Sequence, residues 1–256
     1  MRFKLTLQVN PSAFGCKIPL NYNYELGSLI YKILSKSDRN FSEWLHENGF
    51  QSRNKKFKLF TFSRLHIPEY RIEGGFLRIL CDTIEWQLSF LPERSTQEFI
   101  QGLFHEQTFE LGTREANVQF FVREVSVIAP PSFSDTMLFE TLSPICISKQ
   151  RTDGGIDYLS PDAPQAVALI RQNLLNKYKA FTGKDFSADF DFGFDVLSKP
   201  KSSLITIKSG TPAQTRVRGF MCEFRLSAPA ELIKIMYEAG VGEKGSTGFG
   251  MCKAIP

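Results

Sequence analysis

Hydrophobic and polar positions in the first half of the chain switch between a strand-like and a helical period. Residues 2–9 alternate as in a half-buried strand, and residues 25–48 then follow the helical spacing. Ser37 or Asp38 is suited to cap a second helical segment, which ends at Gly49. The other elements expected here are strands at 58–65, at 75–90 (one or two) and at 118–128, and a helix at 92–107.

The second half repeats this order after "APPSFSD" (129–135), a stretch typical of a linker. The expected elements are strands at 137–148 and 188–196, a helix at 162–180 that stops at Gly183, a hairpin turning at 210–212, a helix at 229–239 and a short last strand. Two β-α-β-β-α-β units in series predict an α+β protein with two tandem ferredoxin-like (RRM-like) domains, at 1–130 and 131–256.

A glycine-rich segment, "GVGEKGSTGFG" (240–250), lies between the last helix and the last strand. The ATP-binding P-loop needs Gly-Lys-Ser/Thr in direct sequence, after a strand and before a helix. Here Gly245 separates Lys244 from Ser246, and only "MCKAIP" follows the loop. This order argues against ATP binding. Two interpretations stay open: backbone N–H groups that approach an anionic chain closely, and a long flexible turn.

Composition and charge indicate which partners and sites are to be expected. A net charge of +4 and a pI near 8.7 permit an anionic partner. No apolar run approaches the roughly 18 residues of a membrane span, and the N-terminus does not read as a signal peptide, so we expect no membrane partner and a cytoplasmic location. Five cysteines without a CxxC pair predict reduced, mostly buried thiols. Three histidines without metal-ligand spacing predict no metal site, and we expect no cofactor.

Four stretches carry a resemblance to a known family. They are "YELGSLIYKILSKSDRNFSEWLHENGF" (24–50), "KLFTFSRL" (58–65), "TLSPI" (141–145) and "GVGEKGSTGFGM" (240–251). Together they resemble the CRISPR-associated endoribonucleases that cut repeat RNA to make guide RNAs, within the RAMP superfamily. The resemblance covers nearly the whole chain, and its last stretch is the family's glycine-rich signature. We therefore expect the loop to lie against RNA or in the cleft between the domains.

The resemblance also implies a metal-independent active site made of a tyrosine, a histidine and a lysine. Tyr31 in "LIYKIL", His46 in "EWLHENG" and Lys58 before "LFTFS" match these three residues. The implied partner is CRISPR repeat RNA, as precursor transcript and as processed guide. A CRISPR effector complex is a further implied partner, and the chain is expected to be a monomer or a homodimer.

The chemistry of these residues suits that reaction. The 2′-OH of RNA is an internal nucleophile, so cleavage needs its alignment with the leaving 5′-oxygen and a group that handles protons near neutrality. His46 follows Leu45, off the apolar face, in a last helical turn whose dipole favours an imidazolium. It could act as general acid or general base. Tyr31 would be the second proton group or position the phosphate, and Lys58 would stabilise transition-state charge.

Without the resemblance, each residue has a more ordinary interpretation. His46 would be a helix cap or a surface residue, Tyr31 an aromatic at the edge of the core, and Lys58 a solvated neighbour of a strand. His66 and His105 have no supporting context, and we expect them to be structural.

Positive charge gathers in two segments that are expected to bind RNA. Between residues 199 and 225 six cations accompany one acid, Glu223, which predicts a phosphate track along the hairpin; a solvated hairpin with edge lysines is the alternative. Residues 53–58 contain no acid, and their other cations are alternatives to Lys58. The expected RNA-binding residues are Arg53, Lys55, Lys56, Lys199, Lys201, Lys208, Arg216, Arg218, Gly240, Gly242, Lys244, Gly245, Ser246, Gly248 and Gly250.

Three functions therefore compete at this point. The first is a metal-independent endoribonuclease that leaves a 2′,3′-cyclic phosphate and a 5′-hydroxyl. The second is an RNA-binding subunit that holds a guide without cutting, for which His46 is dispensable. The third is a ferredoxin-like nucleotide enzyme, which the glycine loop disfavours because it lacks the P-loop order.

Overall fold

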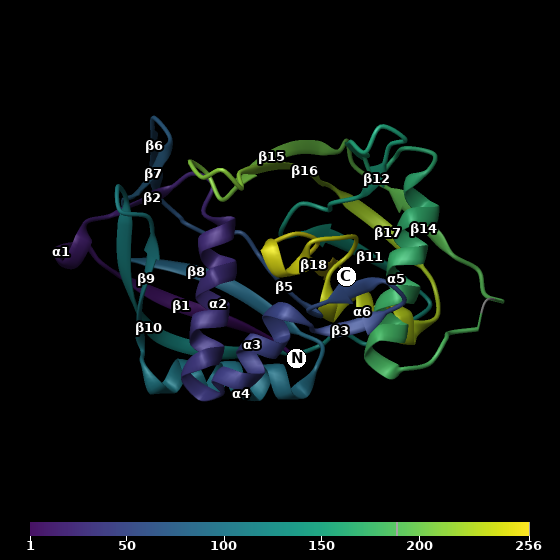
Figure 1. Cartoon of the computed structure of the whole chain (residues 1–256), viewed down its shortest axis with the longest axis horizontal. Helices are drawn as coiled ribbons and strands as arrows, with labels where there is room; N and C mark the ends of the chain where they lie inside the picture. The colour runs from purple at the N-terminus through teal and green to yellow at the C-terminus, as the bar shows by residue number, and fades with distance from the viewer. Residues whose placement is uncertain (188, 256) are drawn as a thin grey trace.

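The computed structural model describes residues 1–187 and 189–255, and its two halves lie side by side (Figure 1). The first half is built on a five-stranded sheet in the order β5-β8-β1-β10-β9. β1 (Arg2–Asn10) is central and antiparallel to β8 and β10, with Leu5 opposite Trp86 and Val125. Its neighbours are β5 (Phe60–Phe62), β8 (Thr83–Phe90), β9 (Thr108–Gly112) and β10 (Asn117–Ile128).

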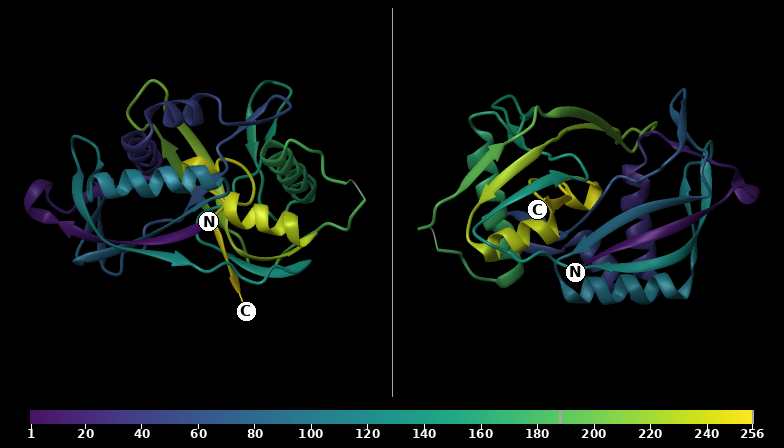
Figure 2. Two further views of the ribbon diagram at one scale, coloured as in Figure 1. Left: turned by 90° about the horizontal axis from the view of Figure 1, so that it is seen from below. Right: turned by 180° about the vertical axis from the view of Figure 1, so that it is seen from behind.

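Three helices cover one face of this sheet (Figure 2). Residues of β1 alternate between buried and more exposed, as the sequence predicts, and the buried set packs beneath the helices. The helices are α2 (Asn23–Ser37), α3 (Arg39–Glu47) and α4 (Glu93–His105).

The second half repeats the arrangement with a four-stranded sheet, β14-β17-β11-β18. In both sheets the core strands run second, third, first, fourth in chain order, so the first strand lies between the third and the fourth. This order confirms the predicted α+β fold with two tandem ferredoxin-like units. The elements are β11 (Thr136–Thr141), α5 (Ala166–Thr182), β14 (Gly193–Val196), β17 (Glu223–Ser227), α6 (Ala230–Ala239) and β18 (Cys252–Ile255).

Smaller elements lie outside the two main sheets. The hairpin of β15 (Lys201–Ile207) and β16 (Thr215–Met221) turns where the sequence predicts, but it leaves the main sheet and extends over the first half (Figure 1). The stretch at 75–90, predicted as one or two strands, forms two, β7 (Phe76–Ile79) and β8. The pattern did not predict the others: α1 (Pro11–Phe14), β2 (Lys17–Pro19), β3 (Phe50–Ser52), β4 (Lys55–Phe57), β6 (Tyr70–Glu73), β12 (Ser148–Gln150), β13 (Ile156–Tyr158) and η1 (Gly245–Thr247).

Two predicted strands are too long. The strand expected at 58–65 is reduced to β5, because Leu59 has a left-handed φ of 54° that breaks the extended run before it. The strand expected at 137–148 ends at Thr141. Beyond it the chain crosses to the hairpin, where the backbone of Ile145 pairs with Phe220.

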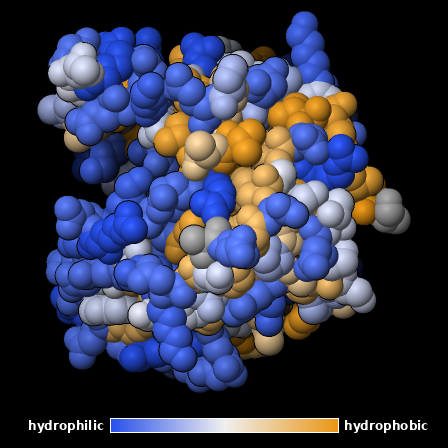
Figure 3. Space-filling view, turned by 90° about the vertical axis from the view of Figure 1, so that its right-hand side faces the viewer, coloured by the Kyte–Doolittle hydropathy of each residue, from blue (hydrophilic) through white to orange (hydrophobic). Residues whose placement is uncertain are grey.

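The alternating stretch at 188–196 forms a strand only at β14, and Ala188 lies outside the described residues. Phe190 instead packs edge-on against Phe186, whose ring contacts Tyr178 of α5. Aromatic packing against a helix, rather than a pleated strand, therefore accounts for part of this alternation. On this side of the C-terminal half, hydrophobic side chains gather among polar ones (Figure 3).

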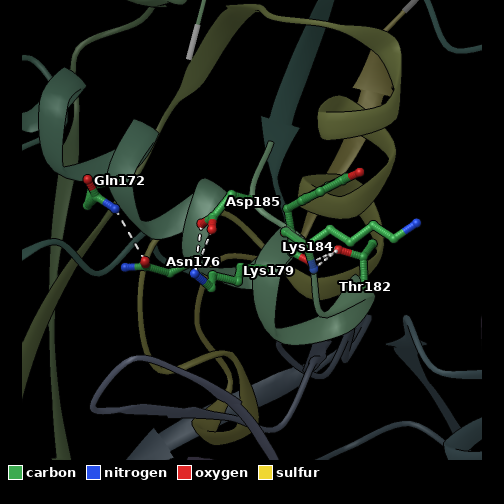
Figure 4. Close-up of polar contacts among 7 residues, drawn as sticks. Gln172, Asn176, Lys179, Thr182, Lys184 and Asp185 are labelled. Carbon is green, nitrogen blue, oxygen red and sulfur yellow. Dashed lines mark hydrogen bonds and ion pairs between the residues drawn. The ribbon is translucent and has the colours of Figure 1, made fainter. Parts of the chain in front are cut away.

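Predicted helix ends are confirmed by their contacts. Asp38 caps α3, since its carboxylate accepts a hydrogen bond of 2.9 Å from the backbone N–H of Phe41. Gly183 ends α5 with a φ of 75°. Two contacts tie the segment after this end to the helix (Figure 4). The Lys179 ammonium in the last turn of α5 pairs with Asp185, and the backbone N–H of Lys184 donates to the Thr182 hydroxyl.

A buried arginine joins the two halves. The Arg2 guanidinium donates to the carbonyls of Cys252 and Tyr237, at 2.6 and 2.5 Å, and lies 3.6 Å from the centre of the Tyr237 ring. Burial lowers the pKa of Arg2 below its ordinary value. Because the first strand of one half is bonded to the last strand of the other, the halves are held together at their sheet ends.

Gly102 of α4 offers a test of the helix packing. A β-carbon there would lie 2.0 Å from the carbonyl oxygen of Ile33 on α2. We expect Gly102→Ala to destabilise the protein by about 1–3 kcal/mol or more, although alanine is the better helix former by about 1 kcal/mol. Urea unfolding measures this, with Gly75→Ala as the control because its β-carbon would meet open space. Equal stability of both variants would contradict the packing described.

Candidate active site

Two predicted catalytic side chains meet where α2 and α3 pack together. The rings of Tyr31 and His46 are 4.9 Å apart between centroids and nearly perpendicular, at 88°. The hydroxyl of Ser42 on α3 donates to the Tyr31 carbonyl on α2, which ties the two helices at this point. Tyr31 is half-buried with its ring also against Phe60, whereas His46 is exposed. The arrangement leaves the imidazole open to a ligand and holds the phenol in place.

Lys58 joins this pair from the segment that follows β4. Its ammonium donates to the backbone carbonyl of His46 at 2.5 Å. Burial, and then the charge of Lys56, lower the pKa of Lys58 to about 8, while Glu47 acts in the opposite direction. The structure thus brings together all three residues that the sequence indicated for catalysis.

The Tyr31 hydroxyl interacts with the side chain of Ser246 in the glycine loop, whose backbone lies against Gly27, one helical turn before Tyr31 on α2. Burial raises the pKa of Tyr31 well above its ordinary value. The phenol, which is protonated near neutrality like any tyrosine, therefore also stays protonated at alkaline pH and can donate a hydrogen bond. It is poorly suited to act as a base.

The glycine loop lies between the two halves, as expected, and is fixed by backbone contacts. Thr61 of β5 donates to the Phe249 carbonyl at 2.9 Å, and the Gly250 N–H donates to the Pro144 carbonyl at 2.9 Å. Gly248 could not carry a side chain, because a β-carbon there would meet the Phe62 ring at 2.6 Å. The structure therefore excludes a long flexible turn.

The predicted RNA-binding residues of the loop divide into two groups. Lys244 is exposed, and Gly245 and Ser246 are partly exposed, so these three can be reached by a ligand. The buried residues shape the loop from inside; they are Gly240, Gly242, Gly248 and Gly250.

Lys177 of α5 is a buried cation that the sequence interpretation missed. Its ammonium donates to the carbonyls of Ala239, Gly240 and Gly242, at 3.3, 2.6 and 2.8 Å. Burial lowers its pKa to about 7, against the opposing charge of Glu243. A signal existed in the sequence: Lys177 lies three positions after Leu174, on the apolar face of the helix, where a lysine is out of place.

A cavity of about 380 Å³ opens between the segment before β5 and the glycine loop. Glu243 is the acid in its wall; its carboxylate accepts a hydrogen bond from Ser148 and lies 3.7 Å from the Lys55 ammonium. With most of its charged groups positive, the cavity is suited to an anionic group. The cations lining it are Lys55, Lys56, Lys58, Lys177 and Lys244.

The hairpin β15–β16 presents the second cationic segment. Two bonds fix it against the first half: the Asn21 side chain accepts from the Thr206 N–H at 3.1 Å, and Arg64 donates to the Ser203 hydroxyl. Five predicted RNA-binding cations on or beside it are exposed, and none forms an ion pair within residues 1–187 and 189–255. They are Lys199, Lys201, Lys208, Arg216 and Arg218.

Other candidates lie apart from the site. His66 pairs through its backbone with Glu85, and His105 ends α4. Arg53 is exposed, in the tight turn between β3 and β4. In the described part of the chain, no three His, Cys, Asp or Glu side chains gather to hold a metal ion. Nor does any described helix have the length and apolar character to cross a membrane.

Each half of the chain matches a known protein family. Residues 17–126 match the family described as CRISPR-associated protein Cas6, N-terminal, and residues 128–254 match CRISPR associated protein Cas6, C-terminal. The CRISPR-associated endoribonuclease Cas6 1 of Methanocaldococcus jannaschii is 30% identical over 255 residues, which cover 98% of this chain and 91% of that protein. This chain belongs to the Cas6 family.

Solved structures of related proteins support the same family assignment. A Cas6-related protein from Pyrococcus furiosus superimposes with a TM-score of 0.84 at 27% identity, covering 100% of this chain and 98% of the other. A structure described as a RAMP protein binding different RNA substrates gives 0.83 at 25% identity, with full coverage of both chains. The predicted membership of the CRISPR-associated endoribonucleases is thereby confirmed for this Cas6 chain.

Proposed function

We propose that this Cas6 protein cleaves CRISPR repeat RNA in the precursor transcript, without a metal ion, to produce guide RNAs. The observation that carries the proposal is the contact between the Tyr31 and His46 rings, with Lys58 bonded to the same helix end. These are a proton-transfer group, a phenol donor and a cation, within reach of one phosphodiester.

The reaction begins with attack of the 2′-OH on the adjacent phosphorus. His46 transfers one of the two protons, either from the 2′-OH or to the leaving 5′-oxygen, and solvent water exchanges the other. Tyr31, which its burial keeps protonated also at alkaline pH, donates a hydrogen bond to a phosphate oxygen. Lys58 stabilises the negative charge that develops in the transition state. The P–O5′ bond breaks, giving a 2′,3′-cyclic phosphate and a 5′-hydroxyl.

The two cationic segments support an RNA path on both sides of this site. Lys55, Lys56 and Lys244 line the cavity beside Lys58, and Arg53 is exposed close by in the chain. The exposed cations of the hairpin would hold phosphates farther along the RNA. The backbone at Gly245 and the hydroxyl of Ser246 are the parts of the glycine loop that RNA would approach.

Several features of the whole chain belong to the same proposal. We divide the chain into domains at 1–130 and 131–256, each carrying one ferredoxin-like sheet. The five free cysteines, three of them buried, are compatible with a cytoplasmic protein. We propose a monomer or a homodimer, which passes its processed guide RNA to a CRISPR effector complex.

The test is cleavage of end-labelled repeat RNA in excess EDTA. A second RNA carries a 2′-deoxy residue at each candidate scissile position. We expect one discrete cut in EDTA with a cyclic phosphate end, and no cut at the deoxy position. Loss of the cut in EDTA would contradict the metal-independent mechanism. Salt-sensitive binding without any cut would identify the protein as a subunit that holds a guide.

The lowered pKa of Lys58 predicts how RNA cleavage depends on pH on the alkaline side. Its pKa is lowered to about 8, so the ammonium loses its proton as the pH rises through that value. We expect kcat/KM, which reports the free enzyme, to fall above about pH 8. Lys58→Arg keeps its charge to a much higher pH and should move this fall upward. Coincident profiles for both proteins, with intact RNA binding, would remove Lys58 from the mechanism.

A further inference from the structure

Lys177 is the only described lysine on α5 that is buried, and its position is unusual for its chemistry. A buried ammonium needs its three N–H donors paired, and the loop carbonyls of Ala239, Gly240 and Gly242 pair all of them. These carbonyls lie at the point where α6 ends and the glycine loop begins. The lysine therefore fixes the start of the loop to the helix of the second half.

The loop has little freedom between this point and the active site. Gly242 has a φ of 75°, and a β-carbon there would lie 2.4 Å from the Cys146 carbonyl. The next N–H, of Glu243, donates to that same carbonyl at 2.8 Å. The turn η1 then carries Ser246, whose backbone oxygen lies so near Gly27 on α2 that a β-carbon there would be 3.0 Å away. A shift at the start of the loop would thus reach Ser246.

We propose that Lys177 is a positioning residue for Tyr31, acting through the glycine loop and the Ser246 hydroxyl. The inference rests on the proposed function, because it assumes that Tyr31 contacts the RNA during cleavage. It assigns a part in catalysis to the second half of the chain, although the catalytic side chains are all in the first half. Ser246 is the last link, since its side chain acts on the Tyr31 hydroxyl and its backbone lies against Gly27, one helical turn before Tyr31 on α2.

Removing the Lys177 ammonium should lower the cleavage rate and leave RNA affinity nearly unchanged. Lys177→Met keeps most of the side-chain volume but leaves three buried carbonyls without a donor. These carbonyls would turn toward water, and the loop would carry Ser246 away from Tyr31. A displacement of about 1 Å at a catalytic group lowers a rate by about 10²-fold. RNA affinity should change little, because Lys177 is buried and its ammonium is paired with three carbonyls, so it adds little to the positive charge that the cavity it lines offers to a ligand.

The first measurement needs no cleavage. The Tyr31 ring lies against the imidazole of His46, so its ring current shifts the NMR signal of the His46 Cε1 proton. The chain has only three histidines, and His46→Ala assigns the signal. We expect Lys177→Met and Ser246→Ala to move it in the direction set by Tyr31→Ala, while the His66 and His105 signals stay in place. An unmoved His46 signal in both variants would overturn the proposal, even if the protein cuts no RNA.

The second measurement separates positioning from lost stability. Leu174→Ala on the same helix removes a buried side chain of the second core and serves as the matched control for a lowered melting temperature. We expect Lys177→Met to reduce the single-turnover rate about 10²-fold at unchanged RNA affinity. Lys177→Gln, which keeps two donors, should restore part of it, and Leu174→Ala should cleave normally below its melting temperature.

A Tyr31→Phe background completes the test. If Lys177 acts through the Tyr31 hydroxyl, Lys177→Met should cost no further rate once that hydroxyl is absent. An equal loss in both backgrounds would make Lys177 a purely structural residue. If Lys177→Met does not fold, Ser246→Ala carries the same test from the loop, and a wild-type rate in Ser246→Ala would contradict the proposal. A wild-type protein that cuts no RNA would instead overturn the proposed function.

Discussion

Replacement of His46 by alanine is expected to reduce the rate of RNA cleavage by roughly 10²–10⁴-fold, the usual contribution of a positioned proton-transfer group. RNA affinity should stay within about twofold, because phosphate contacts by cations supply most of it. The expectation follows from the position of the imidazole, which is exposed beside the Tyr31 ring. Since His46 contributes little buried surface, its loss should leave the fold intact.

Single-turnover cleavage and equilibrium binding, measured on the same RNA, check this result. His105→Ala is the matched control: His105 is also an exposed histidine in the last turn of a helix, but it lies on α4, away from the Tyr31 contact. It should cleave at the wild-type rate. An unchanged rate for His46→Ala would contradict the mechanism. A parallel loss of binding and cleavage would show that His46 holds RNA rather than transferring a proton.

The fold could be predicted from the sequence because its signals are local. The alternation of β1, the apolar stripe of α2 and the Asp38 cap each reflect a few neighbouring residues, and each is confirmed. The strand at 58–65 failed because a positive φ at Leu59, which only the tertiary structure imposes, interrupts it. The unpredicted hairpin β12–β13 is too short for its period to be recognised.

The candidate site was predictable only in part. Tyr31, His46 and Lys58 were identified through the resemblance, and their own chemistry supports the roles given to them. The interaction between Tyr31 and Ser246 joins residues that lie 215 positions apart, so no pattern along the chain could indicate it. Lys177 did carry a signal, as a lysine on an apolar face, but a long side chain that reaches out to water gives the same pattern. Only the three carbonyls around its ammonium distinguish the two cases.

The hairpin cations give the second large expected effect, this time on affinity. Each phosphate contact made by a cation on single-stranded RNA contributes about 0.7 to the slope of log affinity against log salt. If five side chains contact phosphates, their replacement by glutamine should lower the slope by up to about 3.5 and the affinity by about 10³-fold in 0.1 M salt. The five positions are Lys199, Lys201, Lys208, Arg216 and Arg218, all exposed.

A charge-matched control separates a phosphate track from a general effect of net charge. Five lysines elsewhere each pair with a carboxylate: Lys4 with Glu85, Lys17 with Glu73, Lys36 with Glu106, Lys179 with Asp185 and Lys253 with Glu140. Changing either set to glutamine lowers the formal charge by five, from +4 to −1. If the hairpin is a phosphate track, the variant of the five hairpin cations should lose far more RNA affinity than the variant of the five paired lysines. Its slope of log affinity against log salt should also fall far more. Equal losses would mean that the hairpin is only solvated, and RNA binding would then rest on the cavity beside Lys58 and the exposed part of the glycine loop.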